Sequence, residues 1–298
     1  MYVNDFESYI REHATQKITV GRSGANVYEL DHTHIAKHVR RDRMQSDGDW
    51  DSYQREAQFY LSYASEEYPF LPKIYHCSCT DDEIRLIMEK YLPIDRNRLD
   101  DAILEKIFSS LAQIHSMPVP VFLPQSDEGA LYLSEDDIDQ YVNGWLGVIR
   151  EHDNAFSEDD LVMIGKNINT INKLVYSPKK MCCHGDFHFD NLLTDYNGNI
   201  IVCDWQNVNK GHPSGDISFF LSRLSADGFD IDKERAIEAY CRFSDGITHD
   251  EISMQMSLAN LNVSFIFWHN YLHSSSTDHV RGIWNKMTAD AKYLLKKI

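Results

Sequence analysis

Two neighbouring stretches decide the fold of this chain: Cys183-His184-Gly185-Asp186-Phe187-His188-Phe189-Asp190-Asn191-Leu192-Leu193 and Ile200-Ile201-Val202-Cys203-Asp204-Trp205. Asn191 follows Asp186 by five positions, and Asp204 lies thirteen further on, after an apolar run that predicts a strand. Phosphoryl transfer needs a carboxylate to deprotonate the attacking hydroxyl and oxygen ligands that hold Mg²⁺ against the phosphates. Singly, each residue could be an ordinary turn or strand-end residue. Their joint spacing favours a phosphoryl-transfer site.

The same segment resembles the aminoglycoside phosphotransferase and choline kinase family, whose fold is that of the protein kinases. The match is to the pattern His-Gly-Asp-x-His-x-x-Asn-Leu-Leu, with an Asp-Trp pair where protein kinases have Asp-Phe-Gly. The resemblance implies that Asp186 is the catalytic base and that Asn191 and Asp204 are the Mg²⁺ ligands. It also implies that His184 braces the loop without taking part in the chemistry. His188 is typical of the family and is assigned no role beyond shaping the loop.

A segment further along the chain supports this assignment. The run Gly211-His212-Pro213-Ser214-Gly215-Asp216-Ile217 resembles the family segment in which an aspartate caps a helix and ties down the catalytic loop. Asp216 also precedes an apolar run, as a plain helix N-cap does. Both interpretations make Asp216 a supporting residue behind the loop that carries Asp186.

Residues that bind the phosphates of the nucleotide are expected near the N-terminus. The run Gly21-Arg22-Ser23-Gly24-Ala25-Asn26-Val27-Tyr28 lies between short predicted strands, where glycines let backbone N–H groups approach phosphate oxygens. It lacks the Walker A and the full Gly-x-Gly-x-x-Gly patterns. It resembles the Gly-x-Ser-Gly-Ala-x-Val-Tyr loop of the aminoglycoside kinases. We therefore predict phosphate contacts from Ser23, Gly24 and Ala25, although the run alone could be a hairpin turn.

The rest of the predicted nucleotide site follows from the resemblance. Lys37 stands on the next strand, where the family places the lysine that contacts the α- and β-phosphates, and Glu56 stands on the next helix as its ion-pair partner. Alone, they would be a solvated lysine and a helix-surface glutamate. In the strand that resembles the hinge, Met88 would abut the purine, and the Glu89 carbonyl and the Tyr91 amide would read its edge. The sequence does not separate ATP from GTP as the phosphoryl donor.

The order of predicted elements divides the chain into two parts. Strands are predicted at 18–21, 26–30, 34–38, 73–77 and 84–88, and helices at 3–13, 53–64, 134–151 and 158–175. From about residue 97 onward, apolar residues recur at intervals of three or four and predict long helices. We expect an α+β, protein-kinase-like two-lobe fold, with a small antiparallel-sheet N-lobe over residues 1–90. Residues 91–298 would form the larger, mainly helical catalytic and acceptor-binding lobe.

Composition limits the partners. The chain has 29 Lys and Arg against 46 Asp and Glu, a formal net charge of −17, which opposes binding to nucleic acid or to an anionic membrane. The same charge would suit a cationic acceptor, although many acidic proteins are merely soluble. No signal peptide is visible and no apolar run is long enough to span a bilayer, so we expect a cytoplasmic protein. The six cysteines are expected to be free thiols. Nothing in the sequence implies an obligate protein partner.

The hydroxyl-bearing acceptor is left open by the sequence. Acids in the second half of the chain would suit a polyamine, namely Asp227, Asp230, Asp232, Glu234 and Glu238. A cluster of Phe265, Phe267, Trp268, His269 and Tyr271 would suit a quaternary ammonium group. Acidic helix N-termini and buried aromatic stripes are, however, common. The first hypothesis is an antibiotic-like small-molecule kinase, and the second is a metabolic kinase for choline, an amino alcohol or a sugar. A nucleotide-binding pseudokinase scaffold is disfavoured by the complete set of expected site residues.

Overall fold

The computed structural model describes residues 6–18, 24–64, 67–96, 99–124, 129–152, 156–229 and 231–298. Internal contacts divide the chain into two compact units. Unit 1 comprises Met1–Pro124 and Met181–Gly246, and unit 2 comprises Gln125–Lys180 and Ile247–Ile298. The lobe boundary expected near residue 90 falls inside unit 1, and the two-lobe division stays a prediction.

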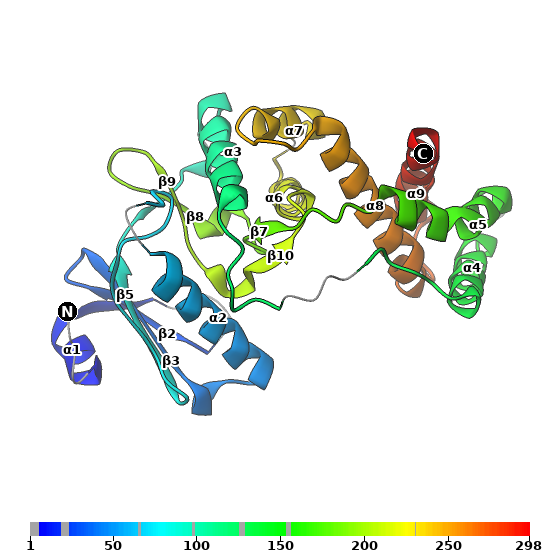
Figure 1. Cartoon of the computed structure of the whole chain (residues 1–298). Coiled ribbons are helices and arrows are strands. Elements are labelled where there is room, and N and C mark those ends of the chain that lie inside the picture. The colour runs from blue at the N-terminus through cyan, green and yellow to red at the C-terminus, as the bar shows by residue number, and fades with distance from the viewer. Residues whose placement is uncertain are drawn as a thin grey trace. The chain divides into compact units, whose positions relative to one another are not determined.

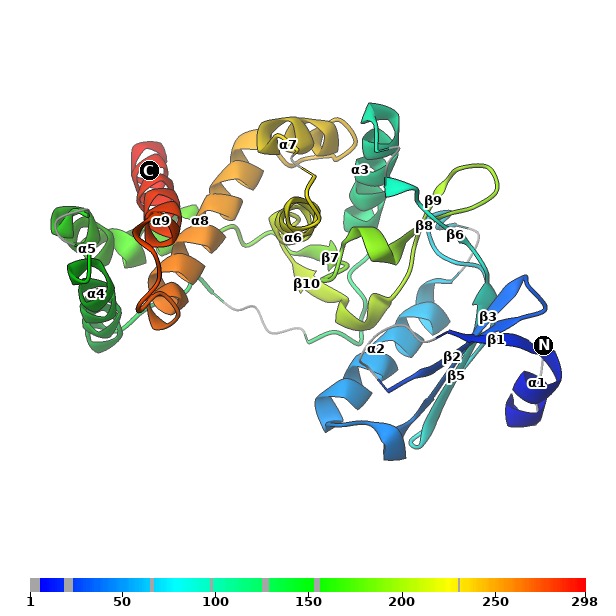
Figure 2. The same cartoon turned by 180° about the vertical axis from the view of Figure 1, so that it is seen from behind.

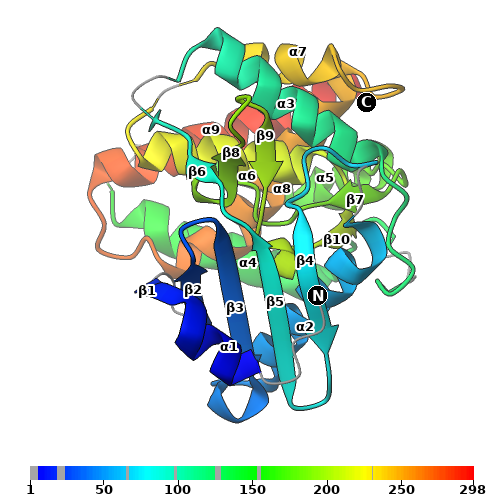
Figure 3. The same cartoon turned by 90° about the vertical axis from the view of Figure 1, so that its left-hand side faces the viewer.

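Unit 1 contains a five-stranded antiparallel sheet with the strand order β1-β2-β3-β5-β4 (Figure 3). The strands are β1 (Ala14–Ile18), β2 (Asn26–Leu30), β3 (His34–Arg40), β4 (Ile74–Cys79) and β5 (Glu83–Glu89). The first strand was expected to begin at Ile18, but β1 ends there. Four of its five residues are exposed, and only Ala14 and Ile18, at its two ends, are apolar, so the edge strand carries no apolar alternation by which the sequence could reveal it. Residues 19–21 of that expected strand lie outside the described residues.

Two helices cover opposite faces of this sheet, α1 (Phe6–His13) and α2 (Asp47–Tyr63) (Figures 1 and 3). The core under α1 contains Phe6, Ile10, Leu30, Ala36 and Ile87. The core under α2 contains Val39, Trp50, Tyr53, Ala57 and Ile84. Because side chains alternate along a strand, Lys37 lies on the same face of β3 as Val39. The lysine therefore points toward α2.

The remainder of unit 1 carries the loop singled out by the sequence (Figure 2). Its helices are α3 (Asp101–Ser116), α6 (Ser214–Ala226) and α7 (Lys233–Cys241), with short 3₁₀ turns η3 (Phe189–Asn191) and η4 (Trp205–Asn207). A further 3₁₀ turn, η1 (Arg41–Arg43), lies between β3 and α2. One small sheet has the order β6-β8-β9, formed by Leu92–Pro93, Leu192–Thr194 and Ile200–Val202. The other pairs β7 (Met181–Cys183) with β10 (Asn209–Gly211). The segment between β7 and β8 contains Asp186 and Asn191, and Asp204 lies just beyond β9.

Unit 2 is helical (Figure 1). Its elements are α4 (Glu135–Arg150), α5 (Glu158–Val175), α8 (His249–Phe267), the 3₁₀ turn η5 (Trp268–Asn270) and α9 (Thr277–Lys297). A serine or threonine side chain caps the N-terminus of each of the four α-helices, namely Ser134, Ser157, Thr248 and Ser276. These caps satisfy backbone N–H groups that would otherwise lack partners and so fix where the helices begin. The core between the helices includes Trp145, Ile164, Leu261, Phe265 and Trp284.

Two further findings concern membrane-spanning helices and cysteines. Across the described ranges, no helix combines the length and the apolar character that crossing a bilayer requires. All six cysteines are free thiols.

Candidate active site

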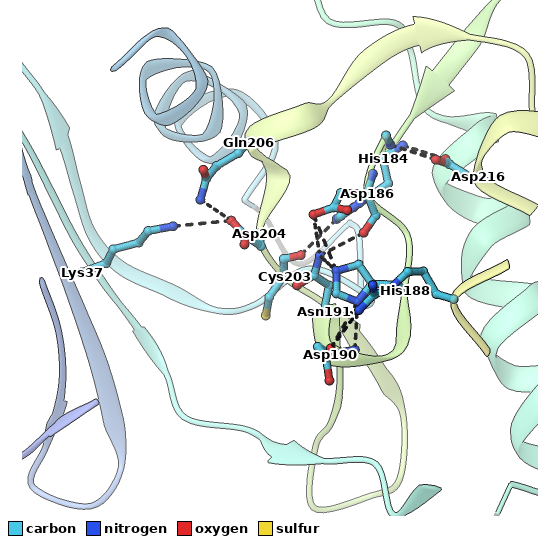
Figure 4. Close-up of polar contacts among 12 residues, drawn as sticks. Lys37, His184, Asp186, His188, Asp190, Asn191, Cys203, Asp204, Gln206 and Asp216 are labelled. Carbon is cyan, nitrogen blue, oxygen red and sulfur yellow. Dashed lines mark hydrogen bonds and ion pairs between the residues drawn. The ribbon is translucent and has the colours of Figure 1, made fainter. Parts of the chain in front are cut away.

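The loop between β7 and β8 brings Asp186 and Asn191 together (Figure 4). Asn191 Nδ2 donates a hydrogen bond to the backbone carbonyl of Asp186 at 2.9 Å and lies 3.3 Å from Asp186 Oδ2. Since these contacts engage the amide nitrogen, the amide oxygen of Asn191 is the atom left to bind a cation. The five-residue spacing thus places the Asn191 amide within hydrogen-bonding distance of Asp186.

Asp204 stands at the end of β9 in an unusual backbone conformation. Its φ of 65° and ψ of 63° lie in the left-handed region, which is uncommon for a residue other than glycine. Asp204 Oδ1 lies 3.5 Å from Lys37 Nζ, and Lys37 Nζ donates to Glu56 Oε2 at 2.7 Å. One ammonium group therefore connects two carboxylates that come from different elements of unit 1.

The ion pair formed by Lys37 and Glu56 is buried. Their side chains are only 13% and 4% exposed, so the alternative of a solvated lysine and a helix-surface glutamate is wrong. Burial raises the pKa of Glu56, the Lys37 charge lowers it and the Asp204 charge raises it, leaving it at about 7. Burial lowers the pKa of Lys37, but the charges of Glu56 and Asp204 outweigh this and raise it above its usual value. The ammonium, which also lies 4.7 Å from the centre of the Tyr53 ring, stays charged at neutral pH.

Replacing Lys37 by Met is expected to lower kcat/KM for the nucleotide by about tenfold or more, the cost of losing a hydrogen bond to a charged group. Methionine retains most of the side-chain volume, and a Glu56 whose pKa is already about 7 can take up a proton. The variant should therefore remain folded. Steady-state kinetics and thermal unfolding measure the two effects. Lys17→Met, on exposed β1 of the same sheet, is the matched control. Unchanged kinetics in folded Lys37→Met would contradict the assigned role.

His184 and Asp216 hold the loop from behind. Asp216 Oδ2 accepts a hydrogen bond from the His184 backbone N–H at 2.8 Å, and Oδ1 accepts one from the Gly185 N–H at 2.8 Å. His115 Nε2 lies 3.1 Å from the same Oδ2. Asp216 is the third residue of α6, which Pro213 precedes without a side-chain cap, so the N-cap interpretation is wrong. The carboxylate binds the loop instead of its own helix.

The geometry of the loop also depends on His184 and Gly185. His184 Nε2 donates to the Cys203 carbonyl at 3.0 Å, which connects the loop to the end of β9. Burial lowers the pKa of His184, so the imidazole is neutral. Gly185 has a φ of +80°, and a Cβ atom there would lie 2.1 Å from the Asn207 carbonyl oxygen. Only glycine fits this position.

Sequence reasoning gave His188 no specific role, but the structure places it against Asp186. His188 Nε2 lies 3.6 Å from Asp186 Oδ2, and His188 Nδ1 accepts from the Asp190 backbone N–H at 3.3 Å. The imidazole lowers the pKa of Asp186 against the raising effect of burial, so the carboxylate is ionised at neutral pH. Arg96, which the sequence did not single out, forms ion pairs with Asp190 and Asp227. These contacts tie η3 to the C-terminal end of α6.

The other nucleotide-site predictions are only partly covered by the structure. Ser23 lies outside the described residues. Gly24 has a φ of +73°, and a Cβ there would lie 3.2 Å from the Arg43 carbonyl oxygen, so this position suits glycine. Ala25 packs against the core under α2. The contacts that these residues would make with phosphate stay predictions.

The residues of the expected hinge lie at and beyond the end of β5. Met88 is buried, and Glu89 is the last residue of the strand. The Glu89 N–H donates to the Lys73 carbonyl at 3.0 Å, and the Tyr91 hydroxyl accepts from the Lys73 N–H at 3.0 Å. Both contacts hold this segment to the start of β4. Purine recognition by Met88, the Glu89 carbonyl and the Tyr91 amide stays a prediction.

The residues suggested for the acceptor have structural contacts of their own. Asp227 pairs with Arg96 at 2.8 Å, and Asp232 caps α7 by accepting from the Glu234 N–H. Asp230 lies outside the described residues. In unit 2, Phe265 is part of the core, whereas Tyr271 is 74% exposed. The members of each group therefore differ in contacts and exposure, and their role toward an acceptor stays a prediction.

The oxygen donors present fit Mg²⁺. Asp204 offers a carboxylate that is 42% exposed, and Asn191 offers an amide whose nitrogen is engaged by Asp186. Carboxylate and amide oxygens are the ligands that this hard cation prefers, and it is usually held by one or two carboxylates together with substrate phosphates. Figure 4 shows both side chains, with Lys37 on the far side of Asp204 from the loop.

Comparison with known proteins identifies relatives of this architecture. A family model described as "Phosphotransferase enzyme family" matches residues 17–252. The ADP-bound aminoglycoside phosphotransferase APH(2'')-Ib has a TM-score of 0.56 at 15% identity, covering 97% of this chain and 98% of that one. The gentamicin complex of APH(2'')-IIa has a TM-score of 0.53 at 15% identity, covering 98% and 97%. Choline kinase LicA from Streptococcus pneumoniae has a TM-score of 0.52 at 14% identity, covering 96% and 99%. No curated protein sequence matches the chain significantly. The structural matches confirm the expected fold.

Proposed function

Because the chain belongs to the phosphotransferase enzyme family, we propose that it transfers the γ-phosphoryl group of ATP or GTP to a hydroxyl group of a small molecule. The observation that carries this proposal is the connected set of charged groups in unit 1. Lys37 joins Glu56 to Asp204, and Asn191 is oriented by Asp186. Nucleotide-bound structures of the same fold, with ADP or GDP, support a nucleotide as the donor. A pseudokinase scaffold would not need this complete set.

In the proposed reaction, the ionised Asp186 orients the acceptor hydroxyl and accepts its proton as the oxygen attacks the γ-phosphorus. The bond from that phosphorus to the β,γ-bridging oxygen breaks, and the nucleoside diphosphate leaves with the bonding electrons. Lys37 contacts the α- and β-phosphates. Asn191 and Asp204 would hold Mg²⁺, which when bound neutralises charge on the phosphate oxygens. Asp216, His184 and their hydrogen bonds keep the loop in place for these contacts.

We propose a hydroxylated cation as the acceptor. The formal net charge of −17 attracts a cation, and the neighbours of the same fold include a gentamicin complex and a choline kinase. An antibiotic-like amine is the first candidate, and choline, an amino alcohol or a sugar is the alternative. A thermal-shift screen of hydroxylated amines and sugars, with Mg²⁺ and a non-hydrolysable nucleotide, ranks these classes because ligands that bind the native state raise its melting temperature. Phosphorylated product must then form with ATP or GTP.

Isothermal titration calorimetry with ATP and with GTP, each in Mg²⁺ and in a chelator, tests whether the protein binds a nucleotide donor together with Mg²⁺. We expect Asp204→Asn to weaken Mg²⁺-dependent nucleotide affinity by about tenfold, because a neutral amide is a poorer Mg²⁺ ligand than a carboxylate. Asp81→Asn, at an exposed position in the turn between β4 and β5, is the matched control. Absence of metal-dependent binding by the folded wild-type protein would remove the kinase proposal. Equal affinity in Asp204→Asn and wild type would remove the ligand assignment alone.

A further inference from the structure

Gln206 contacts the carboxylate of Asp204 from the turn η4. Its Nε2 donates to Asp204 Oδ1 at 2.5 Å (Figure 4). A carboxylate oxygen can only accept hydrogen bonds, so the amide nitrogen of Gln206 must be the atom that faces it. The same oxygen lies 3.5 Å from Lys37 Nζ. Both donors therefore contact Oδ1 of Asp204, and neither contacts Oδ2.

The turn that carries Gln206 is fixed against α2. Arg55 Nη1 donates to the Gln206 carbonyl at 3.0 Å, and the Phe59 ring stacks on Trp205 with centroids 3.9 Å apart. Ser52 Oγ lies 3.4 Å from Gln206 Oε1, but its single hydroxyl hydrogen is closer to the Asp49 carbonyl, at 2.7 Å. Arg55 and the ring stack are therefore the stronger links. Through these two contacts, α2, the helix that also carries Glu56, determines the position of Gln206.

Asp204 needs such a partner. Its side chain is 42% exposed, against 4% for Glu56, so burial restricts its orientation less. A carboxylate free to rotate would present either oxygen to a cation and would lose rotamer freedom on binding it. A hydrogen bond from Gln206 selects one orientation before the cation arrives. Partners of this kind commonly change metal affinity by about tenfold to a hundredfold.

We propose that Gln206 is a positioning residue, which holds Asp204 with Oδ1 toward Lys37 and Oδ2 toward the Mg²⁺ that accompanies the nucleotide. The inference rests on the proposed function. It also connects the metal ligand to α2, because Arg55 and Phe59 place the turn that places Gln206. The competing interpretation makes Gln206 itself a metal ligand through Oε1. The observed amide orientation favours the positioning role, because Nε2 faces Asp204 and Oε1 faces Ser52.

Calorimetric titration of ADP, in Mg²⁺ and in a chelator, tests this role without relying on turnover. Gln206→Met keeps the length of the side chain but removes the donor. We expect its dissociation constant for ADP in Mg²⁺ to rise about tenfold, with the value in chelator unchanged. Asn207→Ala, which removes the exposed amide of the next residue in the same turn, should match wild type in both conditions.

Each other outcome overturns the proposal in its own way. An equal loss of affinity with and without Mg²⁺ would show that Gln206 only supports the fold. An unchanged constant in Gln206→Met would show that it has no role. Tighter Mg²⁺-dependent binding by Gln206→Glu would make position 206 a direct ligand site. No Mg²⁺-dependent binding by wild type would instead remove the proposed function, and this inference with it.

Thermal unfolding of each variant shows whether that variant remains folded. Should Gln206→Met fail to fold, Gln206→Asn provides the same comparison, because its amide is one methylene too short to reach Asp204 Oδ1 from η4. We expect it to show the same metal-dependent loss of ADP affinity. Affinity equal to that of wild type in folded Gln206→Asn would contradict the proposed contact.

Discussion

Replacing Asp186 by Asn is expected to lower turnover by roughly two or more orders of magnitude while Mg²⁺-nucleotide affinity stays near that of wild type. The asparagine amide keeps the shape of the side chain but cannot accept the proton of the hydroxyl. In the wild-type protein, the His188 imidazole lowers the pKa of this carboxyl, so the base is ionised at neutral pH. Nucleotide binding should survive because Asn191 donates its shortest contact to the backbone carbonyl of Asp186, which the substitution leaves in place.

The measurement is turnover at saturating nucleotide and acceptor, with nucleotide affinity determined separately by calorimetry. Asp190→Asn is the matched control, since it removes one negative charge from the same loop at a side chain that is 57% exposed and paired with Arg96. Its turnover should stay within a few-fold of wild type. A loose transition state, in which positioning supplies much of the catalysis, would put the Asp186→Asn loss at the small end of the range. Equal losses in both variants would show that loop charge, and not a base at Asp186, is what matters.

The sequence predicted the proximity of those candidate residues whose spacing is local. Asp186 and Asn191 share one short loop, and Asp204 follows a strand directly, so their separation along the chain determines their separation in space. Lys37 faces α2 because alternate residues of a strand point to opposite faces. The helix itself begins at Asp47, earlier than the expected residue 53. Its first turn, Asp47-Gly48-Asp49, has the composition of a loop, and the Ser46 cap is what makes it helical.

Contacts between distant positions could not be predicted in this way. His115 meets Asp216 across 101 positions, and Arg96 pairs with Asp190 across 94. Neither residue type nor spacing identifies such a pair before the chain is folded. The role of Asp216 was misassigned in part for the same reason, because a carboxylate beside an apolar run predicts a cap for its own helix. The backbone N–H groups that Asp216 binds belong to another loop, 31 and 32 positions earlier.

Replacing Asp216 by Asn is expected to lower the free energy of unfolding by about 3 kcal/mol, because it removes the negative charge from a buried, hydrogen-bonded cluster of charged groups. The Asp216 side chain is only 2% exposed and accepts from the N–H groups of both His184 and Gly185. An amide would turn its NH₂ group against one of these donors. Urea unfolding at neutral pH measures the loss. Asp195→Asn is the matched control, because that carboxylate also accepts from two backbone N–H groups, those of Asn197 and Asn199, but remains open to solvent. Its loss should be smaller.

The pH dependence separates the charge of Asp216 from its shape. Burial raises the pKa of this carboxyl, but the hydrogen bond from His115, the charges of His115 and His184 and the Gly185 N–H bond outweigh burial and lower it below its ordinary value of 3.8. A depressed pKa in the folded state means that the ionised group adds stability at pH values above the ordinary pKa that the carboxyl has in the unfolded chain. This contribution is lost as the pH falls through the folded-state value. The difference in unfolding free energy between wild type and Asp216→Asn should therefore be constant near neutral pH and shrink below about pH 4. A difference that stays constant through this acidic range would mean that packing at position 216, and not the negative charge that binds the loop, carries the stability.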